Sequence, residues 1–303
     1  MDRLCETLRL CGVPFQTAYL LSEHSSFRIG GNADVAVFPR TKEELLQTLD
    51  AVRRYDTPYL LMGRASNVVF SDDGFRGAVI YTTSFRSCSV SGNLISADAG
   101  ATLFSLAVAA EQAALAGLEF AHGIPGTLGG ALVMNAGAYG GCMCDVCVSS
   151  SYYDMETGNV GTVTGDAHAF GYRTSVYTLH PHYVVLDATL SLHADDPVLI
   201  RERMEDFKQR RRSSQPLEFP SVGSVFKRPE GHFAGKLIED CGLKGLSVGG
   251  AEVSRKHAGF IINRGGATAM DVRRLVEQIQ EAVLQRYGVE LECEIRFLES
   301  GRV

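Results

Sequence analysis

The sequence has 303 residues, of which 45% are hydrophobic and 21% are charged, and its formal net charge is −6. This length exceeds what one compact core usually holds, and the composition excludes bulk disorder, so we expect two or three folded domains. A negative net charge argues against non-specific binding of nucleic acid, which requires a basic surface to displace counterions. No window reaches the roughly 20 apolar residues of a membrane-spanning helix. We therefore expect a soluble, cytoplasmic protein with neither nucleic acid nor membrane as a partner, and the oligomeric state stays open.

The first third of the chain alternates strand-like and helix-like patterns. A strand-like segment at 33–38 precedes a helix that starts at Thr41, where Thr41 and Glu44 have the spacing of a capping box. Further strands are expected at 58–62, 78–82 and 94–99, followed by an alanine-rich helix from about Leu103 to Gly117. The chain therefore opens as an α/β unit.

The second half has a different order of elements. A strand at 183–192 precedes a helix that opens at Asp195-Asp196-Pro197 and runs into the basic cluster 208–212, and we place a domain boundary directly after that cluster. The rest is expected to contain a strand at 259–263, a helix at 271–287 that Gly288 ends, and a final strand at 291–298. These elements predict a second, α+β unit with its own core.

Three glycine-containing segments precede the boundary, at 28–34, 62–67 and 123–140. Backbone N–H groups in such loops can converge on an anion and bind a pyrophosphate without a lysine. None of the three matches the GxGxxG dinucleotide fingerprint or the Walker phosphate loop, so a Rossmann domain is not expected. Composition alone leaves two alternatives open for each segment, a set of tight turns or part of a cofactor site.

The order of these segments resembles the UDP-N-acetylenolpyruvoylglucosamine reductase (UDP-N-acetylmuramate dehydrogenase) family, bacterial enzymes of peptidoglycan precursor synthesis. The resemblance continues through GYRTS at 171–175, SVGSVFKRP at 221–229, GHFAGKLIE at 231–239, KHAGFIIN at 256–263 and CEIRFLE at 293–299. It implies an α+β fold with a vanillyl-alcohol-oxidase-type FAD-binding region in two lobes, 1–83 and 84–212, and a C-terminal α+β substrate-binding domain at 213–303. The short spacing between GYRTS and SVGSVF resembles the branch of the family that lacks an extra substrate-closing loop.

The resemblance also implies a reaction. NADPH reduces a non-covalently bound FAD, and hydride then passes to the β-carbon of the enolpyruvyl ether of a UDP-sugar, which leaves negative charge delocalised toward the carboxylate. Arg173 and Glu294, the latter as a neutral acid, match the family residues that stabilise this charge, and Ser224 matches the proton donor. Without the motifs, each residue has an ordinary interpretation: a surface ion-pair arginine, a solvated strand glutamate and a turn serine.

Binding residues follow from the same match. Lys236 and His257 lie in segments that match substrate contacts, although a lysine near a helix start or a lone histidine is usually structural. The residues implied for FAD are Gly63, Arg64, Ala65, Ser66, Asn67, Gly123, Ile124, Pro125, Gly126, Thr127, Gly129, Gly130, Asn135 and Arg296.

The sequence departs from the family pattern at several positions. Ala65 replaces the second glycine of a GxGSN loop, which adds strain of about 1 kcal/mol if that position needs a positive φ. Ser214 stands where the shorter branch tends to carry a lysine. Cys142, Cys144 and Cys147 form a CxCxxC run without a second ligand pair at zinc-ribbon spacing, so we expect reduced thiols and no metal.

Three further hypotheses remain. His122 directly precedes the GIPG segment and could suggest a covalent histidyl flavin, which the family does not use. A flavin oxidase of the same superfamily acting on a small alcohol or sugar would explain the glycine segments, but not the three motif residues together. A non-catalytic nucleotide-binding protein is favoured only by the altered loop at Ala65.

Overall fold

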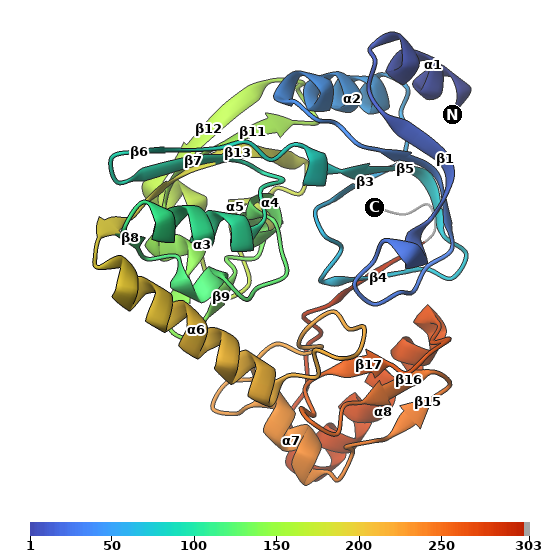
Figure 1. The fold of residues 1–303 in the computed structure, drawn as a ribbon. Helices are drawn as coiled ribbons and strands as arrows, with labels where there is room; N and C mark the ends of the chain where they lie inside the picture. The colour runs from blue at the N-terminus through green and yellow to red at the C-terminus, as the bar shows by residue number, and fades with distance from the viewer. Residues whose placement is uncertain (300–303) are drawn as a thin grey trace. The chain divides into compact units, whose positions relative to one another are not determined.

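The computed structural model describes residues 1–299, which form two compact units (Figure 1). The first unit holds Met1–Thr17, Val35–Arg64 and Gly77–Arg210, and the second holds Ala18–Asp34, Ala65–Arg76 and the chain from Arg211 onward. The chain therefore enters the second unit three times. The division into 1–83, 84–212 and 213–303 stays a prediction.

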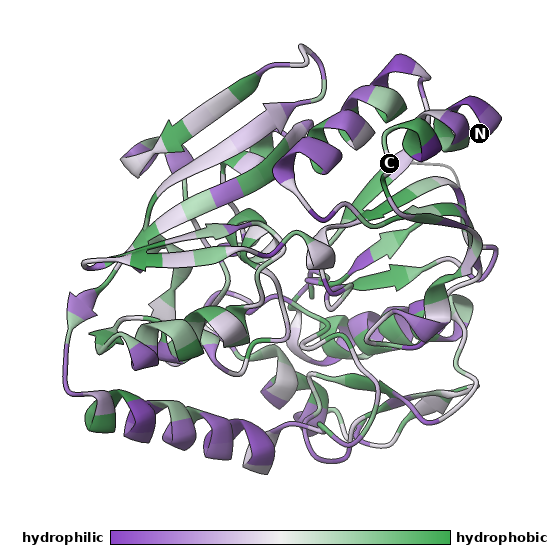
Figure 2. Cartoon of the chain, turned by 45° about the horizontal axis from the view of Figure 1, so that its top comes forward, coloured by the Kyte–Doolittle hydropathy of each residue, from purple (hydrophilic) through white to green (hydrophobic). Residues whose placement is uncertain are grey.

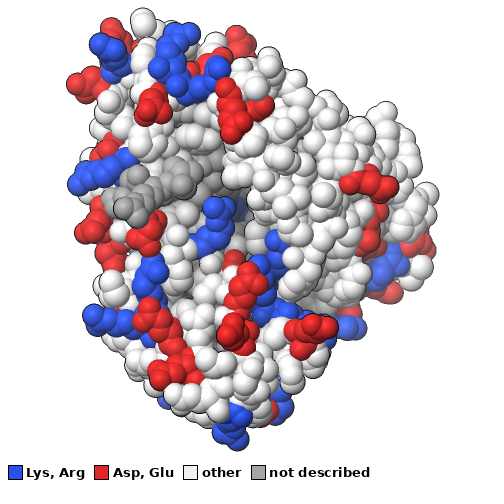
Figure 3. Space-filling model, turned by 180° about the vertical axis from the view of Figure 1, so that it is seen from behind, with Lys and Arg blue, Asp and Glu red and all other residues white. Residues whose placement is uncertain are grey.

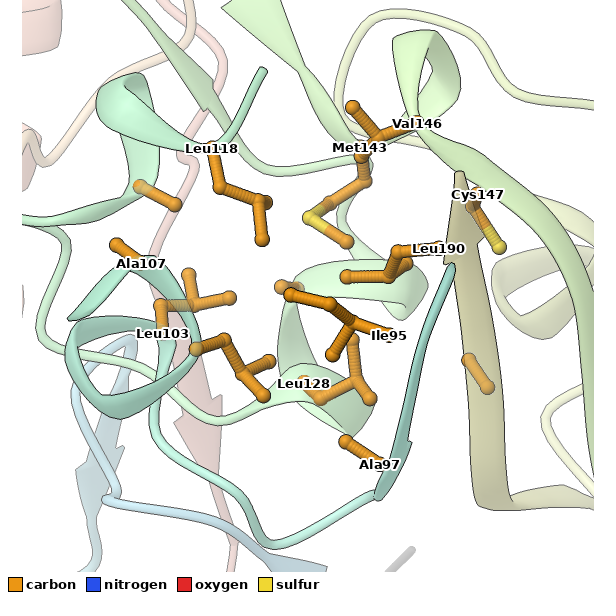
Figure 4. Packing of buried hydrophobic residues seen from close by; sticks show 14 of the residues in the cluster. Ile95, Ala97, Leu103, Ala107, Leu118, Leu128, Met143, Val146, Cys147 and Leu190 are labelled. Carbon is orange, nitrogen blue, oxygen red and sulfur yellow. The ribbon is translucent and has the colours of Figure 1, made fainter. Parts of the chain in front are cut away.

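A five-stranded antiparallel sheet forms the centre of the first unit. Its strands, in spatial order, are β12 (Val160–Thr164), β11 (Cys147–Asp154), β13 (Tyr183–Ser191), β7 (Leu94–Asp98) and β6 (Cys88–Ser91). One face of this sheet is covered by α3 (Leu103–Gln112), α4 (Leu128–Val133) and α5 (Val176–Leu179) (Figure 1). Figure 4 shows Ile95, Leu103, Leu128, Met143 and Leu190 meeting in the core between these layers.

A second core of this unit lies beside α1 (Asp2–Leu10) and α2 (Lys42–Arg54). Thr41 caps α2 as predicted, because its side chain accepts the N–H of Glu44. The reciprocal half of the capping box is not formed, since the Glu44 carboxylate instead accepts the N–H of Arg40 at 2.7 Å. A four-stranded sheet has the order β1 (Phe15–Leu20), β2 (Asn32–Val37), β5 (Phe75–Tyr81) and β3 (Tyr59–Met62), with β3 and β5 parallel.

The second unit combines a three-stranded antiparallel sheet with two helices. The elements are β15 (Ser247–Val248), β16 (Ala251–Val253), β17 (Ile261–Asn263), α7 (Ala234–Asp240) and α8 (Ala269–Tyr287). The predicted helix α8 is confirmed: Thr268 caps its start in a capping box with Asp271, and Gly288 ends it at φ 67°. β18 (Arg296–Leu298) pairs in parallel with β4 (Val68–Phe70), and Phe27, Ile29 and Val69 contribute to the core of this unit.

The largest errors in the predicted boundaries are five residues each. The helix from Leu103 ends at Gln112 rather than at Gly117, because Ala114 takes φ 56° and Leu115–Ala116 then forms β8, which pairs with β14 (His193–Ala194). The final strand begins at Arg296 rather than at Leu291, because Cys293 pairs with Phe226 in an isolated bridge instead. In both cases the backbone forms a different hydrogen-bonded pairing within a segment whose side-chain pattern predicts one continuous element.

The remaining elements are short, except for α6 (Pro197–Ser214), which begins at the predicted Pro197 and is largely hydrophilic in Figure 2. Its buried residues are Ile200 and Met204. The short strands are β9 (Gly137–Ala138) and β10 (Gly141–Cys142), and the 3₁₀ turns are η1 (Leu21–Glu23), η2 (Thr82–Ser84), η3 (Glu119–Ala121), η4 (Met143–Asp145) and η5 (Gly165–His168). Within residues 1–299, no helix combines the length and the apolar character that crossing a bilayer requires. On the face shown in Figure 3, basic and acidic side chains are interspersed.

Candidate active site

Two of the glycine segments meet in the first unit. Gly63 directly follows β3, and a Cβ built on it would lie 2.2 Å from the Thr127 Oγ1 atom. A side chain at this position would displace the Thr127 side chain, so glycine allows this close approach. The structure therefore brings together Gly63 and Thr127, which the sequence assigned separately to the cofactor site.

The GIPG segment is held by main-chain hydrogen bonds to the residues that lead into α3. Thr127 forms a bridge with Thr102, and the N–H groups of Leu103 and Leu128 donate to the carbonyls of Gly126 and Ala101, at 3.1 and 2.8 Å. These bonds give the loop a fixed main-chain course. Residues Gly123, Ile124 and Pro125 form its first half and are at least partly exposed.

The glycines of this loop differ in what they contact. A Cβ on Gly129 would meet the Ala99 Cβ at 3.0 Å, so packing explains that glycine. Apart from the adjacent residues and the backbone of α4 itself, the nearest described heavy atoms to Cβ atoms built on Gly126 and Gly130 would lie at 3.9 and 3.8 Å. Packing within the chain does not require glycine at these two positions, whereas a ligand that approaches the main chain would require it.

His122, just before this loop, gives a second indication that a ligand binds here. Its Nδ1 atom is buried and has no hydrogen-bond partner among the described residues, and its ring lies 5.0 Å from that of Phe104. Burial also lowers the pKa of His122, which favours the neutral ring. A buried ring nitrogen without a partner costs free energy unless a bound molecule or water satisfies it. Together with the open main chain at Gly126 and Gly130, this atom makes the loop fit a bound FAD.

Ala65, which replaces a glycine in the first loop, has the positive φ that the sequence analysis associated with strain. Ala65 takes φ 48°, in the left-handed region, and is 5% exposed. Its carbonyl accepts the Ser26 N–H at 3.4 Å. The expectation of a strained alanine is therefore confirmed.

We predict that Ala65→Gly raises the free energy of unfolding by about 1 kcal/mol, because glycine adopts this φ without steric cost. In a protein of this size that corresponds to a rise in melting temperature of about 2 °C. Ala97→Gly is the matched control, since Ala97 is also 5% exposed but lies in β7 with a negative φ, and it should lower stability instead. A melting temperature that falls equally in both variants would contradict the assignment of strain to Ala65.

Arg173 lies at the tip of a tight turn in the first unit. Gly171 and Thr174 exchange main-chain hydrogen bonds at 3.1 and 3.4 Å, and Arg173 takes φ 56° between them. The third position of a type II turn has this positive φ and usually carries glycine. The Arg173 guanidinium lies 5.3 Å from the centre of the Tyr172 ring, and the Tyr172 side chain is exposed. Arginine is therefore an unfavourable residue for this positive φ, and its guanidinium places a positive charge at the turn.

Asn135 connects this turn to a neighbouring one. Its Nδ2 donates to the Gly171 carbonyl at 3.0 Å, and its Oδ1 accepts the Cys144 N–H at 3.0 Å. The residue is 8% exposed and itself takes φ 41°. The sequence assigned Asn135 to FAD, whereas the structure gives its side chain a structural bond to the segment that carries Arg173.

Ser224 and Glu294 lie on neighbouring segments of the second unit. Ser224 forms a bridge with Phe260, and the next residue, Val225, accepts the Glu294 N–H at 2.8 Å. Val225 is buried, whereas Ser224 is exposed and Glu294 is half-buried. The Ser224 hydroxyl makes no hydrogen bond with another described residue. The structure therefore brings together two of the three predicted catalytic residues on one fixed backbone.

The same backbone is bonded to the predicted FAD loop. The Asn67 Nδ2 donates to the Glu294 carbonyl at 3.1 Å, and the Arg296 N–H donates to the Asn67 carbonyl at 3.1 Å. The pairing of β18 with β4 begins one residue further on, with Arg296 opposite Val68. Ala65, Ser66 and Asn67 thus belong to the same unit as Ser224, Glu294 and Arg296.

The two predicted substrate residues have different surroundings. Lys236 lies on α7 with an exposed side chain, and its Nζ pairs with Asp240 at 2.5 Å, which raises its pKa. His257 is half-buried, its Nδ1 accepts the Gly259 N–H at 3.1 Å, and its ring packs edge-on against Phe260. Burial lowers the pKa of His257 below its usual range.

We predict that His257 contributes to loss of stability in mild acid. The unfolded chain takes up a proton on this residue near pH 6.5, whereas the folded chain resists it, so stability present above that pH is lost as the pH falls. His257→Asn, whose carbonyl can replace Nδ1 as the acceptor for Gly259, should reduce the loss. Urea unfolding between pH 7.5 and about 5 measures this, with the exposed His232→Asn as control. Equal pH dependence in wild type and His257→Asn would contradict it.

Arg64 completes the predicted set and is an exposed residue of the first unit. Sequence reasoning missed the hydrogen bonds that order the site, chiefly the bond that the Val225 carbonyl accepts from Glu294 and the two bonds of the Asn135 side chain. It also missed the grouping of Asp145 with Cys142 and Cys144, since a carboxylate outside the CxCxxC ligand pattern gave no signal.

The fold and these loops define the class of protein. The sequence model of an FAD-binding domain matches residues 33–164. Berberine bridge enzyme has a similar fold over 65% of this chain and 44% of its own, with a TM-score of 0.51 and 16% identity. The chain has the vanillyl-alcohol-oxidase-type FAD-binding fold with an additional C-terminal domain.

The C-terminal part and the full-length relatives identify the family. The model for the C-terminal domain of UDP-N-acetylenolpyruvoylglucosamine reductase matches residues 215–298. The Clostridium perfringens enzyme of that name is 45% identical over 92% of this chain and 91% of its own, and that of Caldanaerobacter subterraneus is 46% identical over the same shares. The crystal structure of the Thermus caldophilus enzyme covers 95% of this chain and 99% of its own, with a TM-score of 0.80 and 33% identity. The chain belongs to the UDP-N-acetylenolpyruvoylglucosamine reductase family.

Proposed function

We propose that this protein reduces the enolpyruvyl ether of UDP-N-acetylglucosamine to UDP-N-acetylmuramate, with NADPH as donor and non-covalently bound FAD, as a cytoplasmic step of peptidoglycan precursor synthesis. The observation that carries the proposal is the hydrogen-bonded connection in the second unit. It runs from Asn67 of the predicted FAD loop to the backbone of Glu294, and from there to Val225, next to Ser224.

Bound FAD would supply the hydride chemistry that links NADPH to the β-carbon of the enolpyruvyl group. We assign its binding to the segment 63–67, to the loop 123–130 and to Arg296. The open main chain at Gly126 and Gly130 supports this assignment, as does the buried Nδ1 of His122. Asn135 would act mainly by holding Gly171 and Cys144 in place.

Arg173 and Glu294 are assigned to the charge that develops on the substrate. Hydride addition to the β-carbon places negative charge on the α-carbon and its carboxylate, and preorganised donors aimed at such charge lower the barrier by several kcal/mol. The tight turn fixes the backbone of Arg173, and two hydrogen bonds fix the backbone of Glu294. Arg173 would supply a permanent cation, and Glu294 a proton-bearing carboxyl group.

Ser224 is assigned the proton transfer that completes the reduction. Its exposed hydroxyl makes no hydrogen bond with another described residue, so it can be directed at the substrate α-carbon. Lys236 and His257 are assigned to the nucleotide or carboxylate of the substrate. Because its lowered pKa keeps His257 neutral near pH 7, it would act as a hydrogen-bonding group rather than as a cation.

The visible spectrum and NADPH oxidation of the purified protein test this proposal. We expect a yellow protein that releases FAD on denaturation and oxidises NADPH rapidly only when the enolpyruvyl UDP-sugar is present. A colourless protein that takes up no FAD would overturn the proposal in favour of a non-catalytic binding protein. Flavin that is reduced by a small alcohol or sugar, and not by NADPH, would favour the oxidase alternative.

A further inference from the structure

Two thiols and a carboxylate converge on one turn of the first unit. The turn consists of Cys142 and the 3₁₀ helix η4, and the Sγ atoms of Cys142 and Cys144 and a carboxylate oxygen of Asp145 all lie within 4.8 Å of one another. The Asp145 Oδ2 accepts the Cys142 N–H at 2.8 Å and the Cys142 thiol at 3.2 Å. The Cys144 thiol lies 3.8 Å from Asp145 Oδ1.

The turn is fixed from its inner side. Met143 and Val146 are 0% and 5% exposed, and Figure 4 shows both in the core. The Met143 N–H donates to the Ala136 carbonyl at 3.0 Å, and the Cys144 N–H donates to Asn135 Oδ1 at 3.0 Å. The turn therefore buries Met143 and Val146, three residues apart, and leaves the two residues between them, Cys144 and Asp145, exposed.

The third cysteine of the CxCxxC run does not join this group. Cys147 is buried, and its Sγ lies 3.6 Å from His168 Nε2 and 3.7 Å from the Ser149 carbonyl. The sequence pattern led to an expectation of reduced thiols without a metal, whereas the structure separates Cys147 from the other two thiols and places the Asp145 carboxylate beside them. Among residues 1–299, no lysine, arginine or histidine forms an ion pair with the Asp145 carboxylate.

We propose that Cys142, Cys144 and Asp145 bind a thiophilic divalent cation of the Zn²⁺ class, with water in the remaining position. Two thiolates select zinc and softer ions over Mg²⁺ and Ca²⁺, and three protein ligands with one open position are a common zinc arrangement. Zinc–sulfur bonds of about 2.3 Å place two sulfurs about 3.8 Å apart. The two Sγ atoms lie within 4.8 Å of each other, so they need to approach by at most about 1 Å to share one ion. The Asn135 bond to Cys144 acts as an outer contact that orients the turn.

Cadmium binding to the full-length, FAD-loaded protein tests the site, because thiolate–cadmium charge transfer gives an ultraviolet absorption band. We expect one Cd²⁺ per chain in the presence of a phosphine reductant, and displacement of the band by Zn²⁺. Cys142→Ser and Cys144→Ser should each weaken binding by about tenfold or more, and Asp145→Asn should weaken it while keeping the band.

Cys88→Ser is the matched control, since Cys88 is an exposed cysteine on β6 away from the turn. It should bind Cd²⁺ as the wild type does, and far-ultraviolet circular dichroism should confirm that all variants are folded. The proposal would be overturned if Cys142→Ser and Cys144→Ser both bound Cd²⁺ with wild-type affinity, or if the wild type bound none at micromolar concentrations. Because the readout does not use NADPH or the UDP-sugar, its outcome is independent of the proposed reductase activity.

Discussion

Ser224→Ala is expected to let NADPH bleach the flavin at the wild-type rate while product formation slows by about 10²–10⁴-fold, the usual contribution of a general acid. The substitution removes one hydroxyl from an exposed side chain and leaves the backbone bonds of Val225 to Gly259 and Glu294 intact. The variant should therefore keep its FAD and its melting temperature. Stopped-flow absorbance measures flavin bleaching by NADPH and recovery with the UDP-sugar separately.

A matched control is Ser221→Ala, in the same SVGS segment but three residues earlier. It should turn over as the wild type does. If Ser224→Ala formed product at the wild-type rate, another residue would supply the proton. If both steps slowed equally, the serine would have a structural rather than a proton-donating role.

Arg173→Gly and Arg173→Ala are expected to lose activity equally and to differ in stability. Both remove the guanidinium, so kcat/KM should fall by about 10²–10³-fold in each. Glycine relieves the backbone strain at φ 56°, whereas alanine retains it, so the glycine variant should be more stable by about 1 kcal/mol. Steady-state kinetics and urea unfolding of the same preparations give both quantities.

The comparison separates catalysis from folding at this position. If Arg173 served only to hold its turn, activity would follow stability and the glycine variant would be the more active of the two. Equal activity in wild type and either variant would contradict the role assigned to the guanidinium. Arg173→Lys, which keeps a cation but not the planar fork, should retain part of the activity.

Local chemistry made some elements predictable from the sequence. The capping box of Thr268 and Asp271 signals the start of α8, and Gly288 signals its end. The bounds of this helix therefore follow from residues at its own ends. The predicted end of the helix from Leu103 was wrong because Ala114 adopts a left-handed φ that alanine rarely takes. No residue type in this segment signals that conformation. Side-chain preference cannot reveal a backbone that tertiary pairing imposes.

The site could be predicted residue by residue but not as an arrangement. Motif resemblance pointed to Asn67, Ser224 and Glu294 individually, whereas their connection depends on parallel pairing of Val68 with Arg296, more than two hundred residues apart in sequence. Pairings between such distant segments leave no local pattern. Asp145 was missed for a different reason: it directly follows Cys144, but a carboxylate does not belong to the CxCxxC ligand pattern, and only the fold of the turn groups it with the cysteines.

Anaerobic re-oxidation of the NADPH-reduced protein tests the central claim most directly. Mixing one equivalent of the enolpyruvyl UDP-sugar with the bleached protein, without oxygen, should restore the flavin absorbance and yield one equivalent of UDP-N-acetylmuramate. Absorbance that returns only when oxygen is admitted, with the UDP-sugar left unchanged, would contradict the reductase assignment and indicate an oxidase.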